Sequence, residues 1–413
     1  MSNMAASPPR RAAFAFIFVT ILLDMVAFGM MMPVLPRLIE SFVDQDTAQA
    51  ARIFGIFGTV WALMQFLWSP FMGMLSDRFG RRPIILISNF GLALDYVLMA
   101  LAPNLIVLFI GRVISGIASA SMSTSFAYIA DIVEPSRRAA AFGKVGAAFG
   151  AGFILGPALG GFLGSYDLRL PFWVAAALSF ANGLYGLLVL PESLPREKRS
   201  AFSFARANPL GALRLLRSQR QLFVLALVNF FSQLAHVVLV SISVLYAGYR
   251  YQWNEKQIGL MLALVGLSAM AVQGGLMGTI IQYFGERKTL LMGLFCGIAA
   301  FVIFALAPTG LAFLSGIPVM ALWGVAGSAI MGIMTRHVSP SEQGQLQGAN
   351  TSVQSIAQLV GPSIFTLTFA YFIGVRAPVH LPGAPFLLAA LILTISLLIA
   401  LYALAHEDDR GAN

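Results

Sequence analysis

The chain has 413 residues, of which 58% are hydrophobic and only 10% are charged. Its mean hydropathy is +0.82. A water-soluble domain of this length cannot bury that much apolar surface, because a large share of any folded protein faces water, so the composition predicts an integral membrane protein. The single cysteine excludes an internal disulfide framework, and four scattered histidines argue against a zinc centre.

Twelve apolar segments follow one another along the chain, each close to the roughly 20 residues that an α-helix needs to cross a bilayer. The first follows Arg10 and Arg11, exceeds the length of a signal-peptide core and has no cleavage pattern at its end, so we expect a retained helix. The predicted fold class is an all-α integral membrane protein with twelve transmembrane helices. The predicted spans are 13–35, 53–75, 83–102, 105–129, 140–164, 171–190, 221–246, 257–281, 288–308, 311–335, 345–373 and 384–405.

The chain divides into two halves, because a basic stretch separates the sixth predicted span from the seventh. We expect an N-terminal six-helix bundle over 1–190, a cytoplasmic linker over 191–220 and a C-terminal six-helix bundle over 221–413. Duplicated halves of this kind predict a substrate site at their interface and alternating access by rocking. A shift of 205 residues aligns Val133, Pro135, Ser136, Gly143, Gly156 and Pro157 with Val338, Pro340, Ser341, Gly348, Gly361 and Pro362. It also aligns Gly73 and Gly80 with Gly278 and Gly285, with Arg81–Arg82 near Arg287–Lys288.

The basic residues favour one orientation in the membrane. With both termini and the linker in the cytoplasm, nineteen of the 26 Lys and Arg residues lie inside and six lie outside. The net charge of +9 then reflects topology. The expected partners of these basic residues are anionic lipid headgroups, and no nucleic-acid partner is needed to explain the positive charge.

Three charged residues fall within the predicted spans: Asp24 in the first, Asp95 in the third and Arg112 in the fourth. Each costs on the order of 3 kcal/mol on insertion scales, so such residues normally face a cavity and pair with one another. A carboxyl in that setting is able to bind and release a proton during a transport cycle. The alternative is a static ion pair that locks helices together.

A basic loop follows the second predicted span, and Gly73, Asp77, Arg81 and Arg82 are its candidate gating residues. Gly73 permits a close helix approach, and Asp77 lies near a helix N-terminus and the Arg groups, where it favours one closed state. The alternative is a solvated loop that only fixes topology. The weaker copy at Gly278–Lys288 favours the gating role.

The fifth predicted span carries a spaced series of small residues, with three glycines that recur every four positions and share one helix face. We expect a seam for tight packing there and a kink at Pro157. The alternative is generic small-residue packing, which is common in membrane proteins. The series consists of Gly143, Gly152, Gly156, Pro157, Gly160 and Gly161.

The predicted spans of the second half contain no Asp, Glu, Lys or Arg away from their ends. Their polar side chains either line a cavity or bond across helices, and His236 is either titratable or a packing residue. The many Phe and Met residues include an expected adaptable wall for a drug-like ligand. The polar residues are Asn229, Gln233, His236, Gln273, Asn350, Gln354 and Gln358. The phosphate-binding pattern GxxxxGK[ST] does not occur, which excludes ATP-driven transport by this chain, and no nucleophile–base arrangement predicts an enzyme.

These residues resemble the major facilitator superfamily, and the glycine series resembles the signature of its drug/proton antiporter branch. More narrowly, several motifs look like those of the bacterial tetracycline efflux proteins. The motifs are Asp24, Met32–Pro36, Ala62–Phe66, Leu75–Pro83, Asp95–Tyr96, Phe109–Gly116, Ala127–Asp131 and Gly344–Gly348.

The resemblance implies a role for each matching residue. Asp24 and Asp95 would handle protons and substrate in a cavity, with Arg112 organising the coupling. Asp77, Arg81 and Asp131 would form a cytoplasmic gating cluster, and Gln65 and Gln233 would contact substrate. One departure stands out: where the tetracycline exporters carry a histidine in the eighth helix and an aspartate in the ninth, this chain has Ala269 and Gly297.

The resemblance therefore predicts a proton-coupled drug exporter, a monomer in the bacterial inner membrane with both termini cytoplasmic. It implies no cofactor beyond the proton gradient, with magnesium entering only as part of a tetracycline-type substrate complex. The expected substrate is a small amphipathic drug. The alternatives are a carrier for an endogenous metabolite, sugar or lipid, and a receptor or scaffold without transport.

Overall fold

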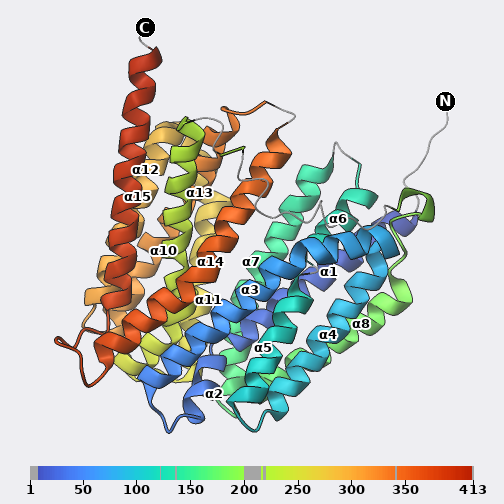
Figure 1. Cartoon of the computed structure of the whole chain (residues 1–413), viewed down its shortest axis with the longest axis horizontal. Coiled ribbons are helices and arrows are strands. Elements are labelled where there is room, and N and C mark those ends of the chain that lie inside the picture. Colours follow the sequence, from blue (N-terminus) through green and yellow to red (C-terminus); the bar gives the residue numbers. More distant parts are fainter. Residues whose placement is uncertain are drawn as a thin grey trace. The chain divides into compact units, whose positions relative to one another are not determined.

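The computed structural model describes residues 8–120, 122–134, 137–199, 215–216, 220–339 and 342–411. All the regular elements among them are helical, as predicted (Figure 1). The first half comprises α1 (Pro8–Met31), α2 (Leu35–Ser41), α3 (Thr47–Phe79), α4 (Arg81–Leu101), α5 (Leu105–Ser119), α6 (Met122–Ile132), α7 (Arg138–Gly164) and α8 (Leu170–Val189).

The second half follows a short 3-10 turn, η2 (Arg196–Lys198). Its helices are α10 (Arg220–Tyr251), α11 (Glu255–Ala271), the π-helical turn η4 (Val272–Leu276), α12 (Met277–Leu306), α13 (Gly310–Thr335), α14 (Gln343–Ile373) and α15 (Ala384–Gly411).

Eleven segments of the described chain are long and apolar enough to cross a membrane. The longest, Glu255–Leu306, has 52 residues, which at the helical rise would extend about 78 Å, far more than a bilayer requires. It contains the predicted span 257–281 and all but the last two residues of the predicted span 288–308, and the backbone leaves the helical region between them, at Gly285. Two of the twelve predicted helices therefore lie in this one segment.

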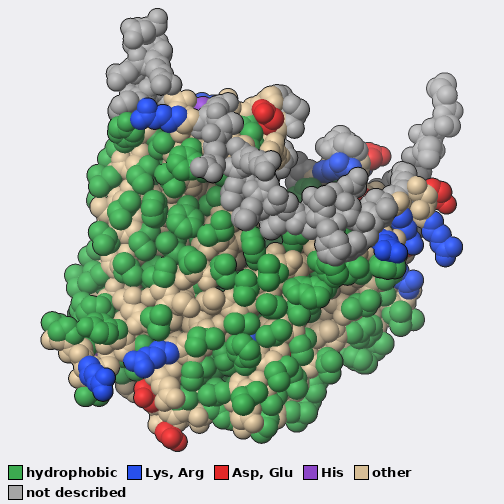
Figure 2. Space-filling model, viewed as in Figure 1, with side chains coloured by type: hydrophobic (Ala, Val, Ile, Leu, Met, Phe, Trp, Pro, Cys, Tyr) green, Lys and Arg blue, Asp and Glu red, His purple; other side chains and the backbone are tan. Residues whose placement is uncertain are grey.

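The helix ends follow local rules. The side chain of Asn104 accepts a hydrogen bond from the Val107 N–H at the start of α5, and Thr309 accepts one from the Ala312 N–H at the start of α13. Such caps satisfy N–H groups that have no partner within the helix. On the face shown in Figure 2, hydrophobic side chains cover the helices, and the charged side chains lie near helix ends. This distribution fits helices that cross a bilayer.

Two compact units make up the fold. The first consists of Met1–Leu38, Val60–Asn208 and Glu255–Ala263, and the second of Ile39–Thr59, Pro209–Asn254 and Leu264–Asn413. The units therefore resemble the predicted halves but exchange two segments: the beginning of α3 belongs to the second unit, and the beginning of α11 belongs to the first.

Within the first unit, α1 packs against α7 and α8, and α4 packs against α5 and α8. The small residues of α7 make the first of these contacts close. A Cβ atom on Gly156 would lie 2.7 Å from the Cα of Gly29, and one on Gly160 would lie 2.2 Å from the Met30 carbonyl oxygen. Gly152 lies against Met25 in the same way. These three glycines thus form one face of α7, and that face contacts α1.

The rest of the glycine series lies elsewhere. Gly161 is packed against Gly259 of α11, inside the first unit, whereas a Cβ atom on Gly143 would meet nothing within 4 Å among the described residues. The helix α7 continues through Pro157, which packs against Gly29.

In the second unit, α10 packs against α14 and α15, and α12 packs against α13 and α15. An aromatic cluster centred on Tyr246 joins these helices. The Tyr246 ring lies 5.0 Å from that of Phe386 and 5.8 Å from that of Phe313, and its hydroxyl donates a hydrogen bond to the Phe304 carbonyl oxygen at 2.9 Å.

Candidate functional site

The three charged residues predicted within the membrane all belong to the first unit. Asp24 lies on α1, Asp95 on α4 and Arg112 on α5. Asp95 is completely buried and Arg112 is 6% exposed, whereas Asp24 is only partly buried. Asp95 interacts electrostatically with Arg112 and with the Ser115 hydroxyl. The structure therefore brings Asp95 and Arg112 together within the first unit.

The pair is not a closed ion pair. Among the described contacts, neither carboxylate oxygen of Asp95 accepts a well-formed hydrogen bond, and the Arg112 Nε–H donates none. The Arg112 guanidinium lies over the Trp61 ring, 5.5 Å from its centroid, as a cation–π contact. A Cβ atom on Gly111 would lie 2.8 Å from Asp95 Oδ1, so the glycine gives the carboxylate room.

Asp24 has its own polar neighbours on α8. Its side chain interacts with Asn182, whose Oδ1 accepts a hydrogen bond from Thr20 at 3.0 Å. Asp24 Oδ1 itself has no partner among the described residues. The buried Tyr96 lies within electrostatic range of Asp24, Asp95 and Arg112. The two carboxyls therefore share this phenol as a neighbour.

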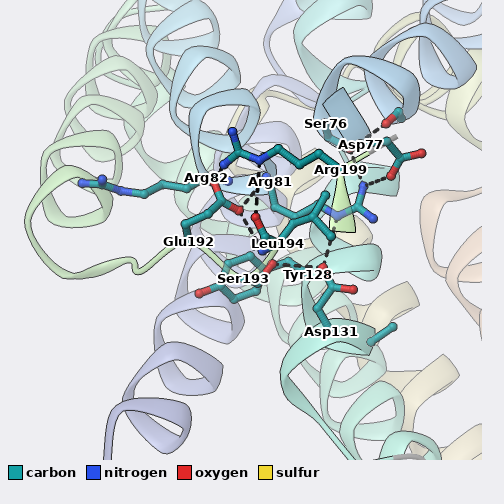
Figure 3. A network of polar contacts seen from close by, with 12 residues as sticks. Ser76, Asp77, Arg81, Arg82, Tyr128, Asp131, Glu192, Ser193, Leu194 and Arg199 are labelled. Atoms are coloured by element: carbon teal, nitrogen blue, oxygen red, sulfur yellow. Dashed lines mark hydrogen bonds and ion pairs between the residues drawn. The ribbon is translucent and has the colours of Figure 1, made fainter. Parts of the chain in front are cut away.

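The predicted gating cluster forms around Arg81 (Figure 3). Its guanidinium makes ion pairs with Asp77 at 2.5 Å and with Asp131 at 3.2 Å, and it donates a hydrogen bond to the Ser76 hydroxyl at 2.6 Å. Arg81 is the first residue of α4, and Asp131 lies near the end of α6. The cluster therefore joins three helices at one end of the first unit.

The other two predicted gating residues lie outside this cluster. Arg82 donates instead to the Leu187 carbonyl oxygen at 2.6 Å, at the end of α8. Gly73 was expected to let two helices approach, yet a Cβ atom there would meet nothing within 4 Å among the described residues. The expected close helix contact at Gly73 is therefore not found among the described residues.

Glu192, which the sequence analysis missed, organises the start of α4. Its carboxylate accepts hydrogen bonds from the backbone N–H groups of Arg81 at 2.8 Å and Arg82 at 3.3 Å, and it lies 3.9 Å from the Arg199 guanidinium. A carboxylate in this place satisfies free N–H groups at a helix N-terminus. The neighbouring Ser193 donates to Asp131 at 3.0 Å. The available signal was a carboxylate directly after the sixth span, near a basic loop.

The turn at Gly80 requires glycine. Its φ is 107°, a region that side chains disfavour, and a Cβ atom there would lie 2.2 Å from Glu192 Oε2. The glycine, the carboxylate cap and the Arg81 cluster thus form one structure.

We expect Glu192→Ala to destabilise the protein by about 1 kcal/mol, because two N–H groups at the start of α4 lose their acceptor. The measurement is the thermal unfolding midpoint in detergent. Glu197→Ala is the matched control, because that carboxylate lies exposed in η2, and it should leave the midpoint unchanged. Equal midpoints for the two variants would contradict the capping role.

The predicted substrate residues are distributed over both units. Gln65 of α3 belongs to the first unit and is partly buried; Gln233 of α10 belongs to the second and is also partly buried. His236, Gln273 and Gln354 are exposed and belong to the second unit. The only one of these with a described ring contact is His236, whose ring lies 5.6 Å from that of Trp323.

Trp323 also explains one departure from the tetracycline exporters. A Cβ atom on Gly297 would lie 2.9 Å from the Trp323 ring and 2.8 Å from Leu393. The indole therefore occupies the space that a larger side chain at 297 would need. Gly324, the next residue of α13, lies against Gln273. Elsewhere in the second unit, the Asn229 side-chain amide donates a hydrogen bond to Asn350 Oδ1 at 3.1 Å.

Comparison with known proteins agrees with this arrangement. The sequence model of the Major Facilitator Superfamily matches residues 17–362. The class C tetracycline resistance protein of Escherichia coli is 36% identical over 87% of this chain and 90% of its own length. The class G tetracycline resistance protein of Vibrio anguillarum is 37% identical over 84% of this chain and 88% of its own length.

Among solved structures, the human organic anion transporter MFSD10 (TETRAN) superimposes with a TM-score of 0.69 at 25% identity. The superposition covers 95% of this chain and 100% of the MFSD10 chain. The family match, the similarity to tetracycline resistance proteins over most of both lengths and the all-helical fold agree. The chain is therefore a non-enzymatic, multi-pass transporter of the tetracycline resistance type that belongs to the major facilitator superfamily.

Proposed function

We propose that this transporter exports a small amphipathic drug in exchange for protons, by alternating access. The observation that carries the proposal is the buried Asp95, which lies beside Arg112 with both carboxylate oxygens free of hydrogen bonds among the described residues. An ionisable group inside a membrane is costly and normally belongs to a substrate or proton pathway. Asp24, partly buried and beside Asn182, is the second proton-handling residue.

For the substrate, we propose a tetracycline–magnesium complex or a similar amphipathic drug. The tetracycline resistance proteins that match this chain support the first choice. The second unit offers aromatic and uncharged polar groups, with His236 exposed beside Trp323 and Gln273 exposed beside Gly324. Such groups suit a planar drug with several hydrogen-bonding oxygens. Magnesium would enter as part of the substrate.

The proposed location is the bacterial inner membrane, with both termini in the cytoplasm and the protein active as a monomer. The basic residues support the orientation through the positive-inside rule. The matching proteins of Escherichia coli and Vibrio anguillarum support a bacterial membrane.

The test is drug accumulation in a bacterial host that lacks its own drug pumps. Cells that express the chain are given tetracycline with magnesium, and then unrelated cationic and neutral drugs. We expect severalfold lower accumulation of at least one drug, reversed by an uncoupler that collapses the proton gradient. Unchanged accumulation of every drug, with the protein shown to be in the membrane, would contradict drug export and favour a metabolite carrier.

A further inference from the structure

The two halves carry the same backbone turn at matching positions. Gly80 and Gly285 are the two glycines with positive φ among the described residues, at 107° and 72°. They are separated by the 205-residue shift that aligns the halves. The first turn lies between α3 and α4, and the second interrupts α12 between two predicted spans. The two turns are therefore structural copies.

Each turn is followed directly by a charged residue that makes an ion pair. In the first half, Arg81 pairs with Asp131 at 3.2 Å. In the second half, Glu286 pairs with Arg336 at 2.8 Å. The same shift of 205 residues takes Arg81 to Glu286 and Asp131 to Arg336. The pair is thus conserved in position between the halves, but its polarity is reversed.

The reversal escapes a comparison of residue types. By residue type, the basic pair Arg81–Arg82 corresponds to Arg287–Lys288, and this match leaves Glu286 out. The glycines at the two turns, Gly80 and Gly285, define how the two halves align. In that alignment the cationic Arg81 corresponds to the anionic Glu286. The ion pairs in the structure show that both positions bind an oppositely charged residue at the matching place in the other helix.

The second pair is built into its surroundings. Glu286 is only 21% exposed at its side chain, and a Cβ atom on Gly332 would lie 2.7 Å from Glu286 Oε1. The carboxylate therefore lies directly over the backbone of α13, one turn before Arg336, which ends that helix. Ile281 and Gln282 stand where the first half has Ser76 and Asp77, so those two partners of Arg81 have no charged or hydroxyl counterparts.

We propose that Glu286 and Arg336 form a second, charge-inverted latch. The pair fixes the turn at Gly285 to the end of α13, as Arg81 and Asp131 fix the turn at Gly80 to the end of α6. Both residues are positioning residues: they hold the second unit in one conformation of the cycle. Arg336 is 72% exposed, whereas Glu286 is 21% exposed. Loss of Arg336 leaves the Glu286 carboxylate without its ion-pair partner, which disfavours the present conformation of the second unit. The amount of folded protein is measured for every variant, so that a conformational shift is distinguished from unfolding. The proposal rests on the proposed function only in taking that equilibrium to be part of a transport cycle.

The test is a charge swap. Glu286→Arg and Arg336→Glu are each made alone and then together, and the double variant has the polarity that the first half already accommodates. The control is the Glu134–Arg137 pair, with side chains 64% and 73% exposed and 3.9 Å apart, as Glu134→Arg and Arg137→Glu. Two quantities are measured: drug export, and the distance distribution between spin labels at Arg78→Cys and Tyr283→Cys in a Cys296→Ser background.

We expect each single variant at 286 or 336 to lower export about three- to tenfold and to shift the label distances. The double variant should restore both, and the two control variants should resemble wild type. A double variant no better than the single ones, or single variants without effect on either measurement, would overturn the latch. Shifted and restored distances in a protein that exports none of the drugs would support the latch and contradict the proposed function instead.

Discussion

Replacing Asp95 by Asn is expected to lower proton-coupled drug export about a hundredfold, the size typical of a lost proton-transfer group. The amount of folded protein should not fall. Asp95 is completely buried and its carboxylate oxygens have no hydrogen-bond partner among the described residues. The uncharged amide has nearly the same shape and is less costly to insert in a membrane. Export is measured in cells, and folded protein by size-exclusion chromatography in detergent.

This result separates the two roles that an intramembrane charge can have. If Asp95 only locked helices through Arg112, its neutralisation would leave a buried guanidinium unpaired and would lower stability. Loss of folded protein together with export would therefore contradict the proton-handling role. Asp44→Asn is the control, because that carboxylate lies exposed in a turn at φ 50°, a region that Asn accepts, and it should export like wild type.

The second large effect is expected at the contact between α1 and α7. Gly156→Leu should destabilise the first unit by about 3 kcal/mol, because extra atoms in a closely packed interface force the helices apart. A Cβ atom alone would already lie 2.7 Å from both the Gly29 Cα and the Val26 carbonyl oxygen. The measurement is the thermal unfolding midpoint of the purified protein.

Gly143→Leu provides the matched control on the same helix. A Cβ atom at Gly143 would meet nothing within 4 Å among the described residues, so the variant should unfold at nearly the wild-type temperature. Similar midpoints for the variants at 156 and 143 would contradict the close contact of α7 with α1.

The helices could be predicted because the bilayer imposes the same length and apolar composition on every span. The break at Gly285 was predicted in position, since the two spans it separates were identified apart. The exchange of the beginnings of α3 and α11 between the units could not be predicted, because it depends on contacts between segments far apart in the chain. The expected close contact at Gly73, which is not found among the described residues, depends on such contacts as well.

At the candidate site, sequence identified the costly residues but not their partners. Asp24, Asp95 and Arg112 could be identified because a charged residue within a membrane span is energetically costly. Trp61 under Arg112, Asn182 beside Asp24 and Glu192 over the start of α4 carry no such signal, because aromatic and polar residues occur in many membrane helices. The inverted pair at Glu286 was missed because matching residue types hides a change of sign.

The most direct test of the central claim is proton movement in everted membrane vesicles. Vesicles that contain the protein are energised so that their interior becomes acidic, and the interior pH is recorded when tetracycline with magnesium, or another exported drug, is added. Proton antiport predicts that the interior becomes less acidic on addition of the drug, and that vesicles with Asp95→Asn show no change. Drug uptake without any pH change, or an equal pH change in the Asp95→Asn vesicles, would contradict proton coupling through this carboxyl.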